Sequence, residues 1–320
     1  MLSHSTIYLL FKSARPRQWV KNLSLFAALL FSGFLFYDPI DAPAYFWTVS
    51  LAAITFTFVT SAIYIANDII DKSADALHPF KQKRPIASGA LSINMARFAV
   101  IVLLACAGYL SLNFSLFFKL LLILYVLLQV AYSKKLKHIP IMDVASIALG
   151  FLIRIYAGSV VVDLHMSVWF LLTVISASFF IAVAKRQSER TLLSGNSAES
   201  VGSTRKILKR YSERLLDQYT SMFATATWLT YAIFTFQNEV IVPQSEFATL
   251  FQLLPKTLHT QKWLMISVPF VIFGVMRYLQ LVYEKNQGES PERVLFSDKP
   301  LLITGFLFGF SVIFILYFFA

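Results

Sequence analysis

Charged residues are scarce in this sequence of 320 residues: Asp, Glu, Lys and Arg make up 14% of it, whereas 57% of the residues are hydrophobic. Soluble globular domains are about one quarter charged. A soluble core could not hide this much apolar surface without leaving large adhesive patches outside. The composition therefore excludes an ordinary soluble domain and indicates a protein that uses lipid as its solvent.

Cysteine and several well-known functional motifs are also lacking. Cys106 is the one cysteine in the sequence, so neither an intrachain disulfide nor a cysteine-rich metal site can form. The sequence contains no G-x-x-x-x-G-K-[ST] loop, no G-x-G-x-x-G fingerprint and no H-E-x-x-H pair. Nucleotide hydrolysis, dinucleotide binding and zinc proteolysis therefore lack support, and we expect no nucleic-acid partner.

Long apolar runs are what the sequence has instead. A membrane-spanning helix needs about 20 mostly apolar residues. We predict an all-α polytopic membrane protein with about nine transmembrane helices, built as a single integral membrane domain over residues 1–320. The predicted spans are 22–36, 44–66, 93–112, 115–132, 141–162, 166–184, 218–236, 263–283 and 300–319. The N-terminus lacks the order of charges and apolar residues typical of a signal peptide, so we expect no cleavage.

The basic residues lie mostly on one side of these spans. Among the 28 Lys and Arg, the exceptions are Lys119, Lys256 and Lys262 on the opposite side and Arg154 within a span. By the positive-inside rule, the N-terminus and the even-numbered loops are expected in the cytoplasm and the C-terminus outside. This pattern predicts a multi-pass protein of the cell inner (plasma) membrane.

A run of acidic residues follows the second predicted span. On a continuous helix, Asn67, Asp68, Asp71 and Asp75 would share about one third of the circumference. Carboxylates this close repel one another unless a cation lies among them. Oxygen donors without His or Cys suit Mg²⁺, so we predict these four residues as its ligands. A solvated helix end is the simpler interpretation, but flanking isoleucines hold the acids at the membrane boundary, where unpaired charge is costly.

Three cations follow the acidic run. Lys81, Lys83 and Arg84 can neutralise the oxygens of a diphosphate that Mg²⁺ bridges to the carboxylates. Anchoring to anionic lipid headgroups is the alternative interpretation, mainly for Lys81 and Lys83. The two halves together predict a diphosphate site.

These residues resemble a known family. The N-D-x-x-D-x-x-x-D run, followed by Arg84-Pro85 and a turn at Gly89, is similar to the first signature of the UbiA superfamily of intramembrane prenyltransferases. Aromatic prenyltransferases of that superfamily carry a second aspartate-rich motif after span 6. Here that position holds Lys185 and Arg186 instead. One acidic cluster with many cations fits a diphosphate donor beside a second anionic substrate.

Further segments resemble the polyprenyl-phosphate (decaprenyl-phosphate) phosphoribosyltransferase branch. They are R-P-x-Q-W-x-K-N from Arg15 to Asn22, R-P-I-A-x-G from Arg84, L-I-R-x-x-A-G around Arg154, and Arg277-Tyr278 followed by Gly288, Pro291, Glu292 and Asp298. The resemblance implies a UbiA-like bundle with a cytoplasm-facing active-site cavity. It also implies transfer of 5-phosphoribose from phosphoribosyl diphosphate to a polyprenyl phosphate, with release of diphosphate, upstream of cell-wall synthesis.

The expected roles follow from the charges that develop in such a reaction. Asp68, Asp71, Asp75 and Arg84 would act catalytically by stabilising the diphosphate that leaves. A lipid phosphate is already an anion and needs position and charge neutralisation rather than a strong base. The predicted substrate-binding residues are Asn67, Lys21, Lys83, Tyr132, Lys134, Lys135, Lys137, Asp143, Arg154, Lys185 and Arg186. Backside attack would invert the anomeric carbon.

The fifth predicted span carries two charges. Asp143 and Arg154 are eleven residues apart, so on one helix they share a face but lie about 16 Å apart along its axis and cannot pair directly. Arg154 is predicted to bind phosphate, and a hydrogen bond to a broken helix or an ion pair with another span is the structural alternative. Gly150 and Gly158, near the same face, are expected to let another helix approach closely.

Two other functions stay open at this point. One is a UbiA-type prenyltransferase acting on an aromatic or lipid acceptor without a second acidic cluster. The other, from a different class, is a transporter or a polyprenyl-lipid binding protein that holds anionic headgroups with its basic face. Loss of function on replacing Asp68 or Asp71 by Asn would separate an enzyme from a carrier. The sequence indicates no oligomeric state.

Overall fold

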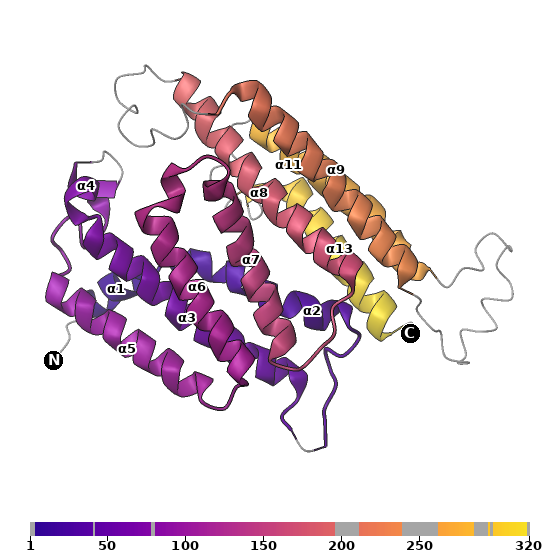
Figure 1. Cartoon of the computed structure of the whole chain (residues 1–320), viewed down its shortest axis with the longest axis horizontal. Coiled ribbons are helices and arrows are strands. Elements are labelled where there is room, and N and C mark those ends of the chain that lie inside the picture. Colours follow the sequence, from indigo (N-terminus) through magenta and orange to yellow (C-terminus); the bar gives the residue numbers. More distant parts are fainter. Residues whose placement is uncertain are drawn as a thin grey trace, which may run out of the picture. The chain divides into compact units, whose positions relative to one another are not determined.

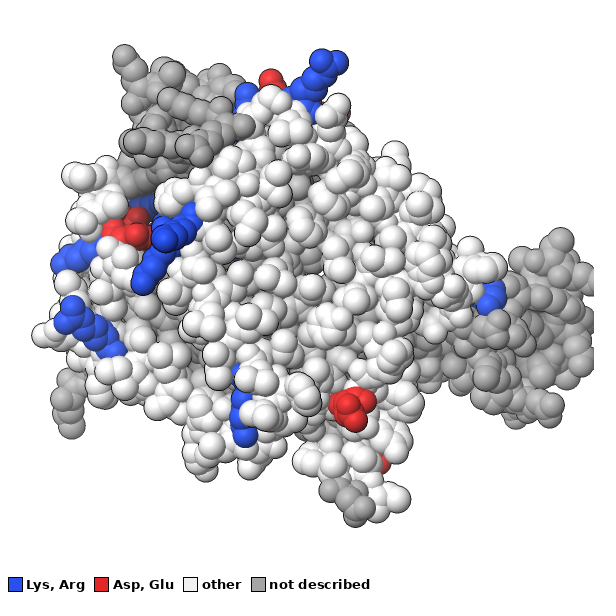
Figure 2. Space-filling model, in the orientation of Figure 1, with Lys and Arg blue, Asp and Glu red and all other residues white. Residues whose placement is uncertain are grey.

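The computed structural model describes residues 4–40, 42–77, 81–195, 211–238, 262–284, 294 and 297–318, and the regular elements in these ranges are all helical, as predicted (Figure 1). Within these residues, seven helices are long and apolar enough to cross a membrane. They are α3 (Tyr45–Ile70), α5 (Ile93–Ser111), α6 (Leu116–Lys134), α7 (Met142–Val160), α8 (Val168–Gly195), η6 with α11 (Trp263–Ser267 and Val268–Tyr283) and α13 (Lys299–Tyr317). Most of the face drawn in Figure 2 carries no Lys, Arg, Asp or Glu, as expected of a surface in lipid.

One predicted span differs from the structure, and another lies in a helix that is less apolar than the rest. Residues 22–36 do not form one helix: a 3₁₀ segment, η1 (Pro16–Leu25), is followed by the six-residue helix α2 (Phe26–Phe31). Residues 218–236 lie within α9 (Glu213–Gln237), which is long enough to span but is rich in threonine and is not among the seven apolar helices. The count of nine spans therefore stays a prediction.

The chain forms two compact units. The first comprises residues 1–29, 34–136 and 153–164, and the second comprises residues 30–33, 137–152 and 165–320. Helix α7 contributes its first part to the second unit and its last part to the first. That the whole chain works as one catalytic domain stays a prediction.

Helix α3 is the centre of the first unit. Its buried residues Val49, Ala52, Phe56 and Val59 recur every three or four positions, so they form one apolar stripe along the helix. The stripe belongs to a core with η1, α6 and the last part of α7, in which the Phe56 ring lies 5.5 Å from that of Tyr125. Figure 1 shows α5 and α6 running beside α3.

Helix α3 also carries hydroxyl groups along its length. Thr55 and Thr57 donate hydrogen bonds to the carbonyl oxygens of Leu51 and Ala53, at 2.8 and 2.7 Å. Because each hydroxyl finds its acceptor one turn back in the same helix, it can lie in an apolar span without a lost hydrogen bond.

Gly158 on α7 brings η1 unusually close. A Cβ atom at this position would lie 1.9 Å from the carbonyl oxygen of Leu25, a contact that no side chain tolerates. The predicted packing role of Gly158 is therefore confirmed.

The second unit is built around α8 and α9, which lie side by side (Figure 1). Phe180 and Ala184 of α8 and Ala224 of α9 are buried together with Leu281 of α11. Side-chain caps fix the starts of two helices: Ser212 accepts a hydrogen bond from the Leu215 amide at 3.1 Å, and Asp298 accepts one from the Leu301 amide at 3.0 Å. Such caps satisfy amide groups that a helix leaves unpaired at its start.

Candidate active site

The acidic run does not continue α3 as one helix, so the condition for a shared helix face is not met. Helix α3 ends at Ile70, Asp71 forms a turn with φ −86° and ψ 6°, and the short helix α4 (Lys72–Ala76) follows. Backbone hydrogen bonds nevertheless run from the Asp71 amide to the Asn67 carbonyl at 2.9 Å and from the Asp75 amide to the Asp71 carbonyl at 2.8 Å. Asp68 and Asp75 are buried, each with 3% of its surface exposed, whereas Asn67 and Asp71 are half-buried.

Arg84 joins the two buried aspartates. Its Nη1 atom donates hydrogen bonds to Asp68 Oδ1 at 3.1 Å and to Asp75 Oδ2 at 2.5 Å. The Lys81 ammonium lies 3.8 Å from the other oxygen of Asp75. Lys81 lies in the 3₁₀ turn η2 (Lys81–Lys83) and Arg84 follows it, so the segment after the acids folds back onto them. The binding of a diphosphate by these cations stays a prediction.

A second arginine reaches the same cluster from the N-terminal segment. Arg15 follows α1 (His4–Ser13), and its Nη2 atom donates to Asp68 Oδ1 at 2.5 Å. Its guanidinium also lies over the ring of Tyr64, 4.9 Å from the ring centre. Arg15 begins the R-P-x-Q-W-x-K-N motif but is not among the predicted site residues.

The end of α6 meets the cluster through a hydrogen bond. Ser133 donates to Asn67 Oδ1 at 3.1 Å, so the last turn of α6 lies beside the end of α3. Lys134 and Lys135 come next in the chain and are exposed, as is Lys83, whereas Lys21 and Tyr132 are half-buried. The first unit thus gathers acids and cations at one end of α3, although the binding of substrate by these cations stays a prediction.

The donor atoms of this cluster fit a hard divalent cation. Asp68 Oδ1 and Asp75 Oδ2 both lie within hydrogen-bond distance of the same guanidinium nitrogen, so one small cation could also reach both oxygens. The donors are oxygens without His or Cys, which suits Mg²⁺. Among the described residues no three acidic, His or Cys side chains converge closely enough to hold a metal by themselves. That geometry fits an ion held by one or two carboxylates and completed by substrate phosphates.

Arg154 is buried in the first unit and holds the broken N-terminal segment. Its Nε atom donates to Asn22 Oδ1 at 3.0 Å, and its Nη2 atom donates to the Tyr125 hydroxyl at 2.5 Å. The side chain of Asn22 donates in turn to Thr57 of α3 at 2.9 Å. These contacts match the structural alternative, a hydrogen bond to a broken helix, and phosphate binding by Arg154 stays a prediction.

The second unit contains a separate buried cluster around Asp143. Arg186 Nε donates to Asp143 Oδ2 at 2.7 Å, and the Tyr211 hydroxyl donates to Asp143 Oδ1 at 2.7 Å. Asp143 and Arg186 have 0 and 1% of their surfaces exposed, and Arg186 also donates to Glu189 at 2.5 Å. Burial, with the hydrogen bond to Asp143, raises the pKa of Tyr211 above its ordinary value of 10.0.

This cluster orients the backbone that leads into α7. Ile141 adopts a positive φ of 69°, which is strained for a β-branched residue, and its amide donates to the Tyr211 hydroxyl at 2.5 Å. Asp143 is therefore paired with Arg186, and Tyr211, which no sequence pattern marked, completes the group. Lys137 and Lys185 are half-buried in the same unit, and their roles as substrate ligands stay predictions.

The C-terminal motif residues also pair with each other. Arg277 donates from Nε and Nη2 to the two carboxylate oxygens of Asp298, at 3.1 and 2.8 Å. Gly288, Pro291 and Glu292 lie outside the described residues. Because Asp298 also caps α13, this pair fixes the packing of α11 against α13 in the second unit.

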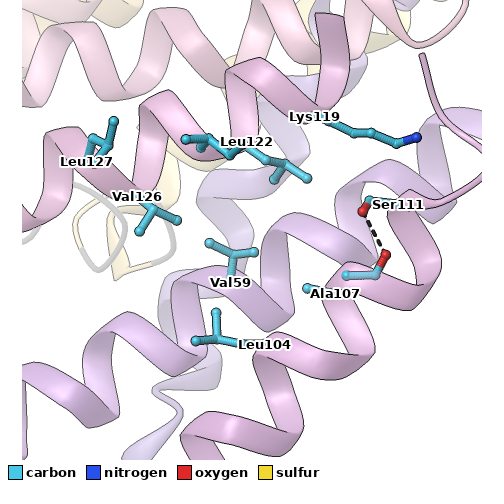
Figure 3. A pocket seen from close by; sticks show the side chains of 10 residues that line it. Val59, Leu104, Ala107, Ser111, Lys119, Leu122, Val126 and Leu127 are labelled. Atoms are coloured by element: carbon cyan, nitrogen blue, oxygen red, sulfur yellow. Dashed lines mark hydrogen bonds between the residues drawn. The ribbon is translucent and has the colours of Figure 1, made fainter. Parts of the chain in front are cut away.

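A cavity of about 370 Å³ lies among α3, α5 and α6, and none of the predicted site residues lines it. Val59, Leu104 and Val126 point toward one another in it, whereas Lys119 points away from them (Figure 3). Its lining is almost wholly apolar, so it does not supply a site for phosphates. The predicted cytoplasm-facing cavity stays a prediction.

Known proteins resemble this chain over most of its length. The model of the UbiA prenyltransferase family matches residues 23–299. The decaprenyl-phosphate phosphoribosyltransferase of Corynebacterium glutamicum is 33% identical over 309 residues, which are 96% of this chain and 86% of that protein. The decaprenyl-phosphate phosphoribosyltransferase of Mycolicibacterium smegmatis is 33% identical over 303 residues, 92% of this chain and 88% of that protein.

A solved structure shares the fold. The structure of a UbiA homolog from Archaeoglobus fulgidus bound to GPP and Mg²⁺ superposes with a TM-score of 0.67, at 19% identity, over 95% of this chain and 99% of that one. With apolar helices of spanning length, the chain is therefore an integral membrane protein of this fold. The match of the family model over residues 23–299 and the relatives of similar length lead to one conclusion: the chain belongs to the UbiA prenyltransferase family.

Proposed function

We propose that this protein transfers 5-phosphoribose from phosphoribosyl diphosphate to a polyprenyl phosphate and releases diphosphate. The single observation that carries this proposal is the 33% identity, over 96% of the chain, to a decaprenyl-phosphate phosphoribosyltransferase. The enzyme would thus be a pentosyltransferase. The cluster of Asp68, Asp75 and Arg84 supports it, because it combines acidic ligands for a metal with a guanidinium for phosphate oxygens.

The reaction exchanges one bond for another at the anomeric carbon of the ribose. The bond from that carbon to the diphosphate oxygen breaks, and an oxygen of the lipid phosphate forms the new bond with its own electron pair. Negative charge grows on the departing diphosphate. Mg²⁺ bound at the acidic cluster would supply charge neutralisation there. We propose backside attack, so that the product has the inverted configuration.

The residues of the first unit have distinct parts in this scheme. Asp68 and Asp75 would hold the metal, and Arg84 would donate hydrogen bonds to the diphosphate as its negative charge increases. Asp71 has no side-chain hydrogen bond or ion pair with any described residue, and the turn that separates it from α3 leaves it half-buried. Since these three acids do not converge on one ion by themselves, we propose that Asp71 becomes a further metal ligand only when the substrate phosphates bring the ion into the site. Lys134 and Lys135, exposed at the end of α6, are proposed to neutralise a substrate monophosphate.

A labelled-substrate assay tests the proposal. Purified protein receives phosphoribosyl diphosphate labelled in the ribose, decaprenyl phosphate and Mg²⁺, and extraction into organic solvent measures labelled lipid. We expect labelled lipid that carries the 5-phosphate. The proposal would be refuted if folded protein made no labelled lipid under conditions in which a wild-type relative, used as the positive control, does so.

Asparagine substitutions test the acidic cluster. Asp68→Asn and Asp71→Asn keep side-chain size but remove the charge that holds the metal, so we expect the rate to fall at least about a hundredfold. Asp163→Asn is a matched control, because Asp163 is exposed and lies far along the chain from the acidic run. Transport or lipid binding by a protein that tolerates both substitutions would favour a carrier.

Prenyl transfer is the second candidate, because the solved structure of a family member contains GPP and Mg²⁺. The same preparation is given a prenyl diphosphate and an aromatic acceptor. Labelled product only in this second assay would replace the first proposal.

The orientation of the chain is also proposed. We infer that the protein lies in the plasma membrane with the acidic cluster at the cytoplasmic face, since the basic segments lie on that side in the sequence. An alkaline phosphatase fused at the C-terminus should then be active. An inactive phosphatase there, with an active one at the N-terminus, would reverse the orientation.

A further inference from the structure

Arg15 adopts a backbone conformation that its sequence disfavours. Its φ of 54° and ψ of 64° lie in the left-handed region, which is uncommon for residues other than Gly, Asn and Asp. Pro16 follows it, and a residue before proline is normally extended. Such a conformation persists only where surrounding contacts determine it, and these outliers cluster at binding sites.

Contacts of the N-terminal segment with α3 hold this conformation. Trp19 donates from its indole nitrogen to the Ala14 carbonyl at 3.2 Å and to the Ser61 hydroxyl at 3.0 Å. Asn22 donates to Thr57 at 2.9 Å. Because the segment is fixed to α3 on the C-terminal side of Arg15, the turn aims the Arg15 side chain along α3 toward Tyr64 and Asp68.

Two guanidinium groups then meet at one carboxylate oxygen. Asp68 Oδ1 accepts from Arg15 at 2.5 Å and from Arg84 at 3.1 Å. The Asp68 side chain is 4% exposed, whereas those of Arg15 and Arg84 are 31% and 29% exposed. Each guanidinium has five N–H donors, and Arg15 uses one of them on the residues that the structure describes. The remaining donors lie at the solvent side of a buried acid.

We propose that Arg15 binds the diphosphate group of the donor substrate together with Arg84. This inference rests on the proposed function, and it adds a ligand outside residues 23–299, which the family model matches. One cation would be enough to neutralise the Asp68 carboxylate, whereas two guanidinium groups bind it. Two guanidinium groups fixed by the same oxygen are close enough to grip the two phosphates of one diphosphate, and their forked donors suit phosphate oxygens.

The test uses three variants. Arg15→Gly keeps the turn, because glycine adopts positive φ without strain, but removes the guanidinium. Arg15→Lys keeps the charge but loses the fork. Arg17→Gln is the matched control, because Arg17 lies two residues away and is exposed. Calorimetry of the full-length protein in detergent measures the binding of inorganic pyrophosphate with Mg²⁺. The temperature of thermal unfolding shows whether each variant is folded.

We expect Arg15→Gly to weaken pyrophosphate binding about tenfold or more and to raise KM for phosphoribosyl diphosphate by a similar factor. KM for the polyprenyl phosphate and the unfolding temperature should change little. Arg15→Lys should fall between wild type and Arg15→Gly, and Arg17→Gln should bind like wild type.

Pyrophosphate affinity equal to that of wild type in a folded Arg15→Gly protein would overturn the proposal. If Arg15→Gly does not fold, folded Arg15→Lys decides: weaker binding supports the role of Arg15, and unchanged binding overturns it. Because pyrophosphate binding needs neither ribose nor lipid, it separates this inference from phosphoribosyl transfer. A protein that makes no labelled lipid but loses pyrophosphate affinity in Arg15→Gly would keep the inference and lose the proposed function.

Discussion

Gly158→Ala should weaken the first unit through one contact. A Cβ atom there would lie 1.9 Å from the Leu25 carbonyl oxygen and 2.6 Å from its carbon, whereas Cβ contacts below 3.0 Å are essentially never seen. The carbonyl would have to move by about 1 Å, and Leu25 is fully buried, so the core must move with it. Overpacking of this kind costs about 1–3 kcal/mol, and alanine returns up to about 1 kcal/mol as a better helix former. We expect a net loss of about 1–2 kcal/mol.

Gly108→Ala is the matched control for this experiment. Gly108 is also helical, but an added Cβ would meet no atom within 4 Å. Its replacement should leave the free energy of unfolding unchanged or raise it by up to about 1 kcal/mol. Both variants are unfolded by increasing SDS in mixed micelles and followed by circular dichroism. A Gly158→Ala protein as stable as Gly108→Ala would refute the reasoning, because the close approach of η1 to α7 would then be unnecessary.

Three more predictions follow from other features. Arg186→Met should destabilise the protein by about 3–5 kcal/mol, because it leaves the Asp143 carboxylate buried without its cation. Adding Asp143→Asn to this variant should restore part of the lost stability. Thermal unfolding of the single and the double variant measures both effects. Burial raises the pKa of Tyr211 above 10.0, so above pH 10 the unfolded chain releases a proton that the folded protein keeps, and stability should fall as pH rises. In Tyr211→Phe this fall should be shallower, and equal slopes would contradict it. EDTA should abolish transfer and leave the circular dichroism spectrum unchanged, and added Mg²⁺ should restore activity; transfer that persists in EDTA would exclude a required metal.

The sequence predicted the apolar helices well. The predicted spans 44–66, 93–112 and 115–132 agree with α3, α5 and α6 to within a few residues. These helices are continuous apolar runs, for which composition and length suffice. The span 22–36 failed because Asn22 finds its partners on α3 and α7, so the segment is held by tertiary hydrogen bonds rather than by its own helix.

The residues of the acidic cluster were predicted, but their geometry was not. A periodic pattern could place Asp68 and Asp75 on one face only if the helix continued, whereas α3 ends at Ile70 and Arg84 joins the two carboxylates by hydrogen bonds. Pairing of Arg15 with Asp68 joins residues 53 positions apart. Tyr211 and Asp143 are 68 positions apart. Contacts over such separations leave no periodic signal, so they were found only in the folded structure.

The hydroxyl groups of α3 have a consequence for the order in which the membrane protein is made. Residues 16–25 leave the ribosome before α3, yet their polar side chains find their partners at Thr57 and Ser61 in the middle of that helix. The threonine hydroxyls of α3 donate hydrogen bonds to carbonyl oxygens of the same helix. Helix α3 can therefore enter the lipid before the N-terminal segment packs against it. The N-terminal segment would then join a helix synthesised after it. We expect a cysteine placed at Asn22 to react with a water-soluble maleimide in membrane-bound chains that are truncated before residue 45 and released from the ribosome, and to be protected once α3 is present.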